Sequence, residues 1–330
     1  MQTQLRQAVV VAFGRTPYCK ARKGSFAQLH PVEYGAQTLL GVLARVPQLR
    51  PEDIGDVIMG CAMPFGVQGG NMARLIVQRA GLPDCVTAQT VNRYCSSGLQ
   101  TIATAANAIR CGEEDVVIAG GVESMSLVPM LVGAEDADPW LAEHRPEVYT
   151  TMGITAENVA RQWGISRADM DAMAVESHRR AAQAQAGGCF DGQIIPITVP
   201  GPDGGEVVVC RDEGIRPGTT AETLAGLKPC FLENGSVTAA TSSQMTDGAG
   251  FVVLMSEEKA AELGVKPLAR FVSFATGGVP AEVMGVGPIE AVPKALRKAG
   301  LTLEQMDTIE LNEAFASQAL AVIRTLGMDP

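Results

Sequence analysis

The sequence is poor in the features that mark several classes of protein. It has 26 basic against 36 acidic residues, which gives a formal net charge of −10. Nucleic acids and anionic membranes bind basic surfaces, so we expect neither as a partner. No apolar run approaches the roughly 18 residues that a membrane-spanning helix needs, and no signal cleavage site follows the apolar start. We therefore expect a cytoplasmic protein.

Metal-binding, disulfide and nucleotide motifs are also missing. The eight cysteines lie scattered through apolar segments without a Cys-x-x-Cys pair, and the three histidines, His30, His144 and His178, stand far apart. These spacings disfavour a zinc ribbon, a disulfide framework and any metal site. Neither a Walker loop nor Gly-x-Gly-x-x-Gly occurs. The acidic charge still allows a small anionic ligand, because a local Arg or Lys pocket can hold one.

The chain does have enough apolar sequence, 46% of its residues, to form two domain-sized cores. Strand-like runs alternate with helix-like stretches near the N-terminus, which favours an α/β fold with a mainly parallel sheet covered by helices. We expect Gly112 to end the last of these helices in the left-handed conformation. The expected strands are 8–13, 57–61, 87–91 and 116–119, and the expected helices are 33–45, 72–80 and 97–111.

The pattern changes in the middle of the chain. Residues 122–248 contain Pro-Gly loops and two expected helices, one after Thr155 and one after Ser166. Ser166 and Asp169 have the spacing of a helix N-cap, and Gly187-Gly188 ends that helix. We interpret this region as an inserted loop domain, after which 251–255 returns as another buried strand.

The end of the chain repeats its beginning. Residues 301–314 align with 49–62 at their apolar positions, and the flanking helices also correspond. This register indicates a duplicated core, in which a strand directly before Asn312 mirrors the expected strand 57–61. It predicts an N-terminal half at 1–121 and 249–266, the loop domain at 122–248 and a C-terminal half at 267–330. Residues 83–124 and 249–256 have no counterpart, so the second half is expected to be incomplete by roughly fifty residues.

Cys95 is the strongest candidate for chemistry. It lies where an expected strand gives way directly to a helix, so free backbone N–H groups and the helix dipole are expected to favour its thiolate. Such a thiolate can act as a nucleophile. Arg93, two residues earlier, could add positive charge. The alternative is a structural cysteine like the other seven.

Five motifs occur along this chain: VNRYCSSGLQ around Cys95, AGGVESMS at 119–126, MGITAEN at 152–158, TDGAG at 246–250 and NEAFASQ at 312–318. In their order and spacing they strongly resemble the motifs of the thiolase family, and the resemblance covers essentially the whole chain. It implies a five-layered αβαβα core of two duplicated halves, with a loop domain over the active site.

The resemblance also implies a reaction. Cys95 would take the acyl group of a 3-ketoacyl-CoA and pass it to a second coenzyme A, releasing acetyl-CoA. The Cys95 backbone N–H and a water positioned by Asn312 would stabilise oxyanions. Judged without the resemblance, Asn312 could equally be an Asx turn or a helix cap. The sequence between 57 and 62 shares the apolar positions of the repeat but lacks the NEA, so only one copy carries a polar role.

Coenzyme A contacts carry over by resemblance to Arg216, Thr223 and Ser243, and Met152 would lie beside the acyl pocket. Each of the three coenzyme A residues could instead be an ordinary loop residue, and Met152 an apolar anchor of the loop domain. Biosynthetic thiolases have His-Met-Gly where this chain has Thr151 before Met152, which favours the degradative subtype. The resemblance implies coenzyme A as a substrate, no permanently bound cofactor, and a homodimer or homotetramer.

Two thiolase motifs are missing. Residues 1–330 contain neither the Gly-His-Pro that activates the cysteine nor the Cys-x-Gly-Gly-Gly that supplies an acid/base thiol. We therefore expect little thiolysis from these residues alone. The alternatives are an acetoacetyl-CoA thiolase working in the biosynthetic direction and a non-catalytic coenzyme A-binding remnant.

Overall fold

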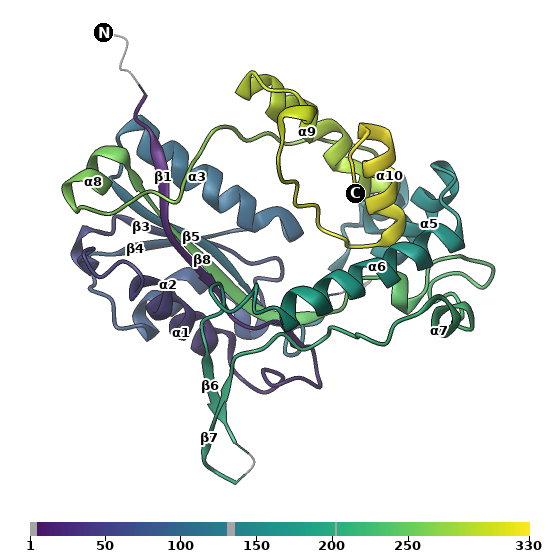
Figure 1. Cartoon of the computed structure of the whole chain (residues 1–330), viewed down its shortest axis with the longest axis horizontal. Coiled ribbons are helices and arrows are strands. Elements are labelled where there is room, and N and C mark those ends of the chain that lie inside the picture. The colour runs from purple at the N-terminus through teal and green to yellow at the C-terminus, as the bar shows by residue number, and fades with distance from the viewer. Residues whose placement is uncertain (1–4, 131–135, 202) are drawn as a thin grey trace. The chain divides into compact units, whose positions relative to one another are not determined.

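The computed structural model describes residues 5–130, 136–201 and 203–330. The chain divides into two compact units, and each is described by itself (Figure 1). Unit 1 comprises Met1–Met130, Gly188–Gly214 and Met245–Phe271, and unit 2 comprises Leu131–Gly187, Ile215–Gln244 and Val272–Pro330. The residues of the predicted loop domain are shared between both units, and the division into three segments remains a prediction.

Unit 1 contains all the strands that the described residues form. They are β1 (Ala8–Arg15), β2 (Cys19–Lys20), β3 (Asp56–Gly60), β4 (Thr87–Val91), β5 (Val116–Glu123), β6 (Ile197–Pro200), β7 (Glu206–Val209), β8 (Thr246–Ser256) and β9 (Ala269–Arg270). Its helices are α1 (Pro31–Leu43), α2 (Met72–Arg79), α3 (Ser97–Cys111) and α8 (Glu257–Glu262). The expected strands and helices of this region are all present, and Gly112 ends α3 with a φ of 77° as predicted.

Seven strands form one sheet, in the order β4-β3-β5-β8-β1-β9 with β2 paired to β8. The ladders of β3 with β4 and with β5 are parallel, whereas β8 runs antiparallel to both β5 and β1. The expectation of a mainly parallel sheet therefore holds for β3, β4 and β5 but not for the sheet as a whole, because β1 pairs antiparallel with both β8 and β9. The last residue of β5, Glu123, pairs with Gly248 near the start of β8. Strand β8 therefore runs in the direction opposite to β5.

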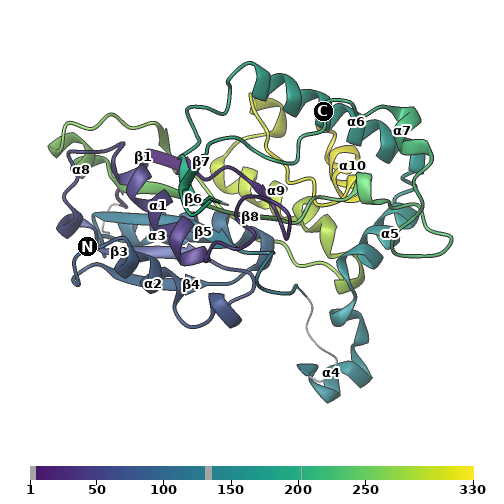
Figure 2. The same cartoon turned by 90° about the horizontal axis from the view of Figure 1, so that it is seen from below.

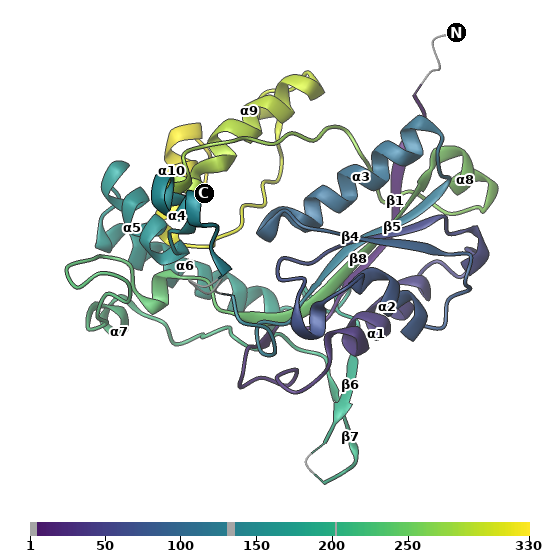
Figure 3. The ribbon, with the colours of Figure 1, turned by 180° about the vertical axis from the view of Figure 1, so that it is seen from behind.

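Helices cover both faces of this sheet (Figure 3). Successive side chains of a strand point to opposite faces. Val57 and Met59 of β3 accordingly belong to the core under α1 and α2, while Ile58 belongs to the core under α3. The small residues Ala105 and Ala106 bring α3 close to the strands. This packing fixes where α3 begins, at the end of β4.

Unit 2 is helical. Its helices are α4 (Pro139–His144), α5 (Met152–Gln162), α6 (Arg167–Ala186), α7 (Ala221–Ala225), α9 (Gly287–Ala299) and α10 (Ala316–Leu326). The helix expected after Thr155 begins earlier, at Met152. Ser166 and Asp169 form the predicted cap of α6, with both reciprocal hydrogen bonds of a capping box. Helices α5, α6 and α10 pack together around buried Ala156, Met170 and Ala316 (Figure 2).

The repeat is visible as a recurring order of elements. The 13-residue α1, the short 3-10 turn Pro51–Asp53 and α2 are matched by the 13-residue α9, the turn Leu303–Gln305 and α10. The strand expected before Asn312 is missing, and that prediction is wrong for the described residues. The reason is physical: β3 pairs with strands on both sides, whereas residues 306–314 have no strand beside them.

Candidate active site

Cys95 lies in the turn that joins β4 to α3. Tyr94–Ser96 form a 3-10 turn, and Ser97 is the first residue of α3. Cys95 is solvent-exposed. The Ser97 hydroxyl donates to the Tyr94 carbonyl oxygen at 2.6 Å and accepts from the Arg93 N–H at 2.8 Å. The sheet and the helix therefore hold the cysteine in a turn with little freedom.

The end of β3 comes close to the start of α3, and this approach determines where the turn with Cys95 lies. A Cβ added to Gly60 would lie 2.5 Å from the Cβ of Ser97, so only glycine allows the start of α3 to come this near. Tyr94 has a φ of 46°, in the left-handed region. For a bulky residue this conformation costs about 1 to 3 kcal/mol and persists only where surrounding contacts enforce it.

The environment of Cys95 opposes the thiolate in the free protein. Loss of water around the sulfur raises the pKa of the thiol; a backbone N–H acts in the opposite direction, and the negative charge of Glu123 raises the pKa further. The expectation that the helix start would favour the thiolate is therefore wrong in its net effect. Arg93 is not among the groups that shift this pKa, and its Nε donates instead to Gln100 Oε1 at 2.9 Å.

Cys61 provides a contrast within the same unit. It is fully buried, and burial together with the neighbouring Glu123 carboxylate raises the pKa of its thiol to about 12. A buried, protonated thiol is chemically inert. Of these two neighbours of Glu123, only Cys95 is accessible to a substrate.

In unit 2 the structure joins two segments that carry predicted site residues. Asn312 is exposed just before α10, and the Ser243 N–H donates to the Ala314 carbonyl oxygen at 2.9 Å. A β-bridge between Ser242 and Phe315 extends this contact. These contacts bring the segment of Ser243 beside the segment that follows Asn312, although the two are far apart in the sequence.

Helix α6 holds the neighbouring segments. Ser177 Oγ donates to Glu313 Oε2 at 2.6 Å, and the backbone N–H of exposed Arg216 donates to His178 Nδ1 at 3.3 Å. Partial burial lowers the pKa of His178, and the charge of Arg216 lowers it further while Glu313 opposes the shift. His178 is thus a hydrogen-bond acceptor for the loop that presents the Arg216 side chain.

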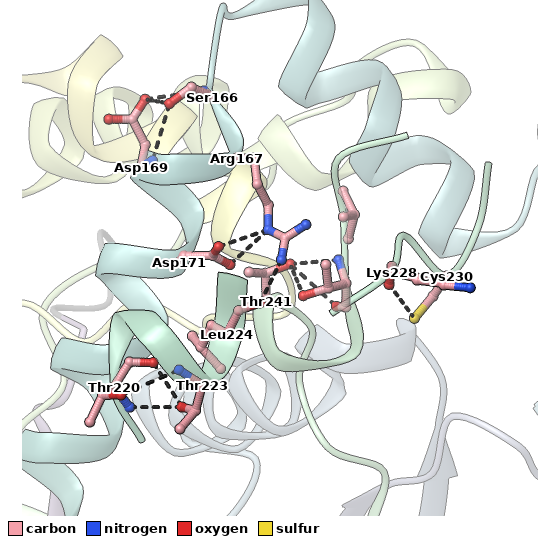
Figure 4. Close-up of polar contacts among 12 residues, drawn as sticks. Ser166, Arg167, Asp169, Asp171, Thr220, Thr223, Leu224, Lys228, Cys230 and Thr241 are labelled. Carbon is pink, nitrogen blue, oxygen red and sulfur yellow. Dashed lines mark hydrogen bonds and ion pairs between the residues drawn. The ribbon is translucent and has the colours of Figure 1, made fainter. Parts of the chain in front are cut away.

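Thr223 already makes local hydrogen bonds, as Figure 4 shows. It forms a capping box with Thr220 at the start of α7, in which its Oγ donates to the Thr220 carbonyl oxygen at 2.8 Å. Arg167, which is paired with Asp171, donates to the Leu224 carbonyl oxygen at 2.8 Å. The Thr223 hydroxyl keeps one acceptor position for a ligand and is otherwise structural.

Met152 is the first residue of α5 and is half-buried. A Cβ on its neighbour Gly153 would lie 2.0 Å from a ring carbon of Phe231, so glycine is required for that ring to pack there. The Phe231 ring meets Phe315 edge-on, with centroids 6.0 Å apart. This aromatic pair was not predicted; Phe315 stands within NEAFASQ, but its partner is distant in the sequence.

Glu157, on the same helix as Met152, is a second residue that the sequence did not single out. Its buried carboxylate accepts from the Ser236 N–H at 2.9 Å and from the Val237 N–H at 2.8 Å. These bonds fix the loop that follows Phe231. The residue stands in the MGITAEN motif, so its position was visible but its partners were not.

Each histidine has a local structural contact. His30 Nδ1 accepts from the Val32 N–H at the start of α1, and the His144 ring stacks on Trp140 with centroids 4.6 Å apart. With His178 bonded to the Arg216 loop, none of the three is assigned as a catalytic base. Across residues 5–130, 136–201 and 203–330 no three His, Cys, Asp or Glu side chains form a metal site, and no helix is long and apolar enough to cross a membrane.

Comparison with known proteins gives matches along nearly the whole chain. Residues 8–258 match the thiolase N-terminal domain and residues 265–330 match the thiolase C-terminal domain. The 3-ketoacyl-CoA thiolase of Bacillus subtilis is 52% identical, over 98% of this chain and 85% of the relative. The human peroxisomal 3-ketoacyl-CoA thiolase is 42% identical, over 100% of this chain and 78% of the relative.

A solved structure agrees with these matches. The Bacillus anthracis acetyl-CoA acetyltransferase superposes with a TM-score of 0.91 at 40% identity, covering 99% of this chain and 85% of the other. The predicted α/β fold class is confirmed by this likeness.

Proposed function

Because this chain belongs to the thiolase family, whose members are acyltransferases, we propose that it transfers acyl groups between a 3-ketoacyl-CoA and coenzyme A through a thioester on Cys95. One observation supports the role of Cys95 above all. The cysteine of the VNRYCSSG motif is exposed in a constrained turn between β4 and α3, whereas neighbouring Cys61 is buried. Relatives named 3-ketoacyl-CoA thiolase supply the substrate class.

The proposed chemistry has two half-reactions. The Cys95 thiolate attacks the C3 carbonyl carbon of the 3-ketoacyl-CoA, the C2–C3 bond breaks, and acetyl-CoA leaves as an enolate that takes up a proton at C2. A second coenzyme A then loses its thiol proton and attacks the Cys95 thioester. The carbon–sulfur bond to Cys95 breaks, the shortened acyl-CoA leaves and the thiolate returns. The proton released by coenzyme A balances the one taken by the enolate.

Both half-reactions place negative charge on a carbonyl oxygen. A preorganised N–H donor is effective in stabilising such an oxyanion. We assign one oxyanion to the Cys95 backbone N–H and the other to a water oriented by the Asn312 amide. The exposed position of Asn312, anchored by the bonds of Ser177 and Ser243 to its neighbours Glu313 and Ala314, supports this role.

Coenzyme A is proposed to bind unit 2. Arg216 presents a planar guanidinium that can pair with phosphate or stack on adenine. Thr223 offers one acceptor, and Ser243 lies beside the segment of Asn312. Met152 is proposed to line the acyl pocket. No permanently bound cofactor is required by this chemistry.

The acyl-enzyme provides the test. The chain is incubated with acetoacetyl-CoA or a longer 3-ketoacyl-CoA, and its peptides are mapped by mass spectrometry. We expect an acyl group on Cys95 that is absent in Cys95→Ser and retained in the control Cys61→Ser. Acylation of another cysteine, or coenzyme A binding without any acylation, would contradict the proposal; the second result would instead favour a non-catalytic binding protein.

A biosynthetic acetoacetyl-CoA thiolase is the second candidate, favoured by the name of the similar Bacillus anthracis structure. Thr151, in place of histidine before Met152, favours the degradative subtype. Comparing acylation of Cys95 from acetoacetyl-CoA with that from longer 3-ketoacyl-CoA esters separates the two. Preference for the longer esters is expected.

We also propose that the protein acts in the cytoplasm, in fatty acid metabolism, as a homodimer or homotetramer. Its partners would be acyl-CoA and coenzyme A rather than nucleic acid or membrane. The net charge of −10 supports the exclusion of polyanionic partners.

A further inference from the structure

The backbone next to Cys95 is held in an unfavourable conformation. Tyr94, the residue before it, has a φ of 46°, and Arg22 is the other non-glycine residue with a positive φ in the described chain. Tyr94 is 64% exposed, so burial of its ring does not compensate for the strain. The contacts that hold this conformation must therefore act on the peptide groups of Tyr94.

Asn92 supplies such a contact on the N-terminal side. Its Oδ1 accepts from the Tyr94 N–H at 2.7 Å, and its Nδ2 donates to the Ala62 carbonyl oxygen at 3.0 Å. One side chain therefore ties the strained peptide to the loop after β3. Ser97 holds the other side of Tyr94 through its carbonyl oxygen.

The Ala62 end of this tie is itself anchored. The Ala62 N–H donates to Glu123 Oε2 at 2.7 Å, and the Met63 N–H donates to Oε1 at 3.3 Å. Gln68, which is fully buried, donates to the same carboxylate at 2.8 Å. Hydrogen bonds thus run from Glu123 through Ala62 and Asn92 to Tyr94, the neighbour of the nucleophile.

We propose that Asn92 is a positioning residue for Cys95, holding the Tyr94 peptide so that the sulfur meets the acyl carbon in a productive orientation. The role rests on the proposed function, because it presupposes acyl transfer to Cys95. Asn92 does not touch the reacting atoms. It acts by preventing the strained turn from relaxing toward ordinary backbone angles, which would move the sulfur.

A purely local role makes a different prediction. The bond from Asn92 to the Tyr94 N–H is by itself an Asx turn, which aspartate also forms. Asn92→Asp keeps this acceptor but cannot donate to the Ala62 carbonyl oxygen. Asn92→Ala removes both bonds. Asn71 is a matched control, because its side chain also accepts from a backbone N–H (Arg74) and donates to a carbonyl oxygen (Ala88), at the start of α2.

Two measurements on the full chain test the proposal. In hydrogen exchange, we expect the Tyr94 amide, which loses its acceptor only in Asn92→Ala, to exchange about tenfold faster or more in that variant than in wild type, Asn92→Asp and Asn71→Ala. In single-turnover acylation of Cys95 by acetoacetyl-CoA, we expect both Asn92 variants to be slower by about tenfold or more. Rates are taken at the high-pH plateau, so that a shifted thiol pKa in Asn92→Asp does not imitate a loss of positioning.

The outcomes are distinct. Unchanged exchange in Asn92→Ala overturns the tie itself. Faster exchange with wild-type acylation shows that Asn92 only stabilises the turn, and overturns the positioning role. If Asn92→Asp is acylated at the wild-type rate, the bond to the Tyr94 N–H alone is sufficient and the bond to Ala62 has no role in acylation. This result also overturns the positioning role. Absence of acylation in the wild-type chain identifies a failure of the proposed function instead.

Discussion

Cys95 combines an accessible position with an unfavourable ionisation. The surrounding protein removes water from the sulfur and Glu123 adds negative charge, while a backbone N–H offsets part of the effect. A nucleophile in this state needs a proton acceptor or a substrate-induced change to become a thiolate. The three histidines all have local structural contacts, and we assign none of them as the acceptor of the Cys95 proton.

The alkylation of Cys95 should follow this raised pKa. We expect the rate with iodoacetamide to keep rising with pH beyond the midpoint of an ordinary thiol, because only the thiolate reacts. Peptide mapping across a pH series measures the midpoint, and the same cysteine in urea-unfolded chain is the control. A folded-state midpoint at or below that of the unfolded chain would contradict the prediction.

Among the elements, α6 depends on its first turn. The carboxylate of Asp169 receives hydrogen bonds from Arg324 and Ser166, which lower its pKa to about 2. The Ser166 contact belongs to the capping box, and the Arg324 contact ties α6 to α10. The same helix carries Ser177 and His178, so its placement affects the segments of the candidate site.

Replacing this aspartate should destabilise the protein in a pH-dependent way. We expect Asp169→Ala to lower the free energy of unfolding by about 1 kcal/mol near neutral pH, mainly through the cap, since solvent screens the half-exposed ion pair. Because folding depresses the Asp169 pKa from 3.8 to about 2, its contribution is present above pH 4 and is lost as the pH falls toward 2.

Urea unfolding of both proteins across that pH range measures the difference. Glu176→Ala, on the same helix but in an exposed pair with Arg179 and Arg180, is the control and should leave stability nearly unchanged. A difference between Asp169→Ala and wild type that persists at pH 2 would refute this origin.

For the whole molecule, the proposed coenzyme A residues all belong to one unit: Arg216, Thr223 and Ser243 belong to unit 2, whereas Cys95 belongs to unit 1. We therefore expect bound coenzyme A to slow hydrogen exchange more in unit 2 than in unit 1. A ligand that binds only the folded chain stabilises it by about 2.7 kcal/mol at a concentration 100 times its dissociation constant.

We expect thermal unfolding to shift upward with coenzyme A, and hydrogen exchange to slow most around 216–243 in unit 2. Adenine or inorganic phosphate alone should protect less. Protection confined to unit 1 would show that the coenzyme A residues have been placed wrongly. The net charge of −10 makes nonspecific binding of this anion elsewhere on the surface unfavourable.

Local patterns were sufficient for much of this description. Apolar periodicity predicted α3 and its neighbouring strands, Gly112 and Ser166 marked helix ends, and the motif around Cys95 indicated the family. These features depend on residues close in sequence, where propensity and capping act directly. The strand expected within 306–314 is missing for a non-local reason, because a strand forms only where another strand pairs with it.

The contacts that shape the site join distant segments. Nothing in VNRYC reveals that Asn92 reaches Ala62, or that the Glu123 carboxylate opposes the thiolate of Cys95. The same holds for Phe231, which packs on Gly153 only when its loop meets the start of α5. Charge, burial and hydrogen-bond partners depend on which segments the fold brings together, and that arrangement is the result of packing the whole chain.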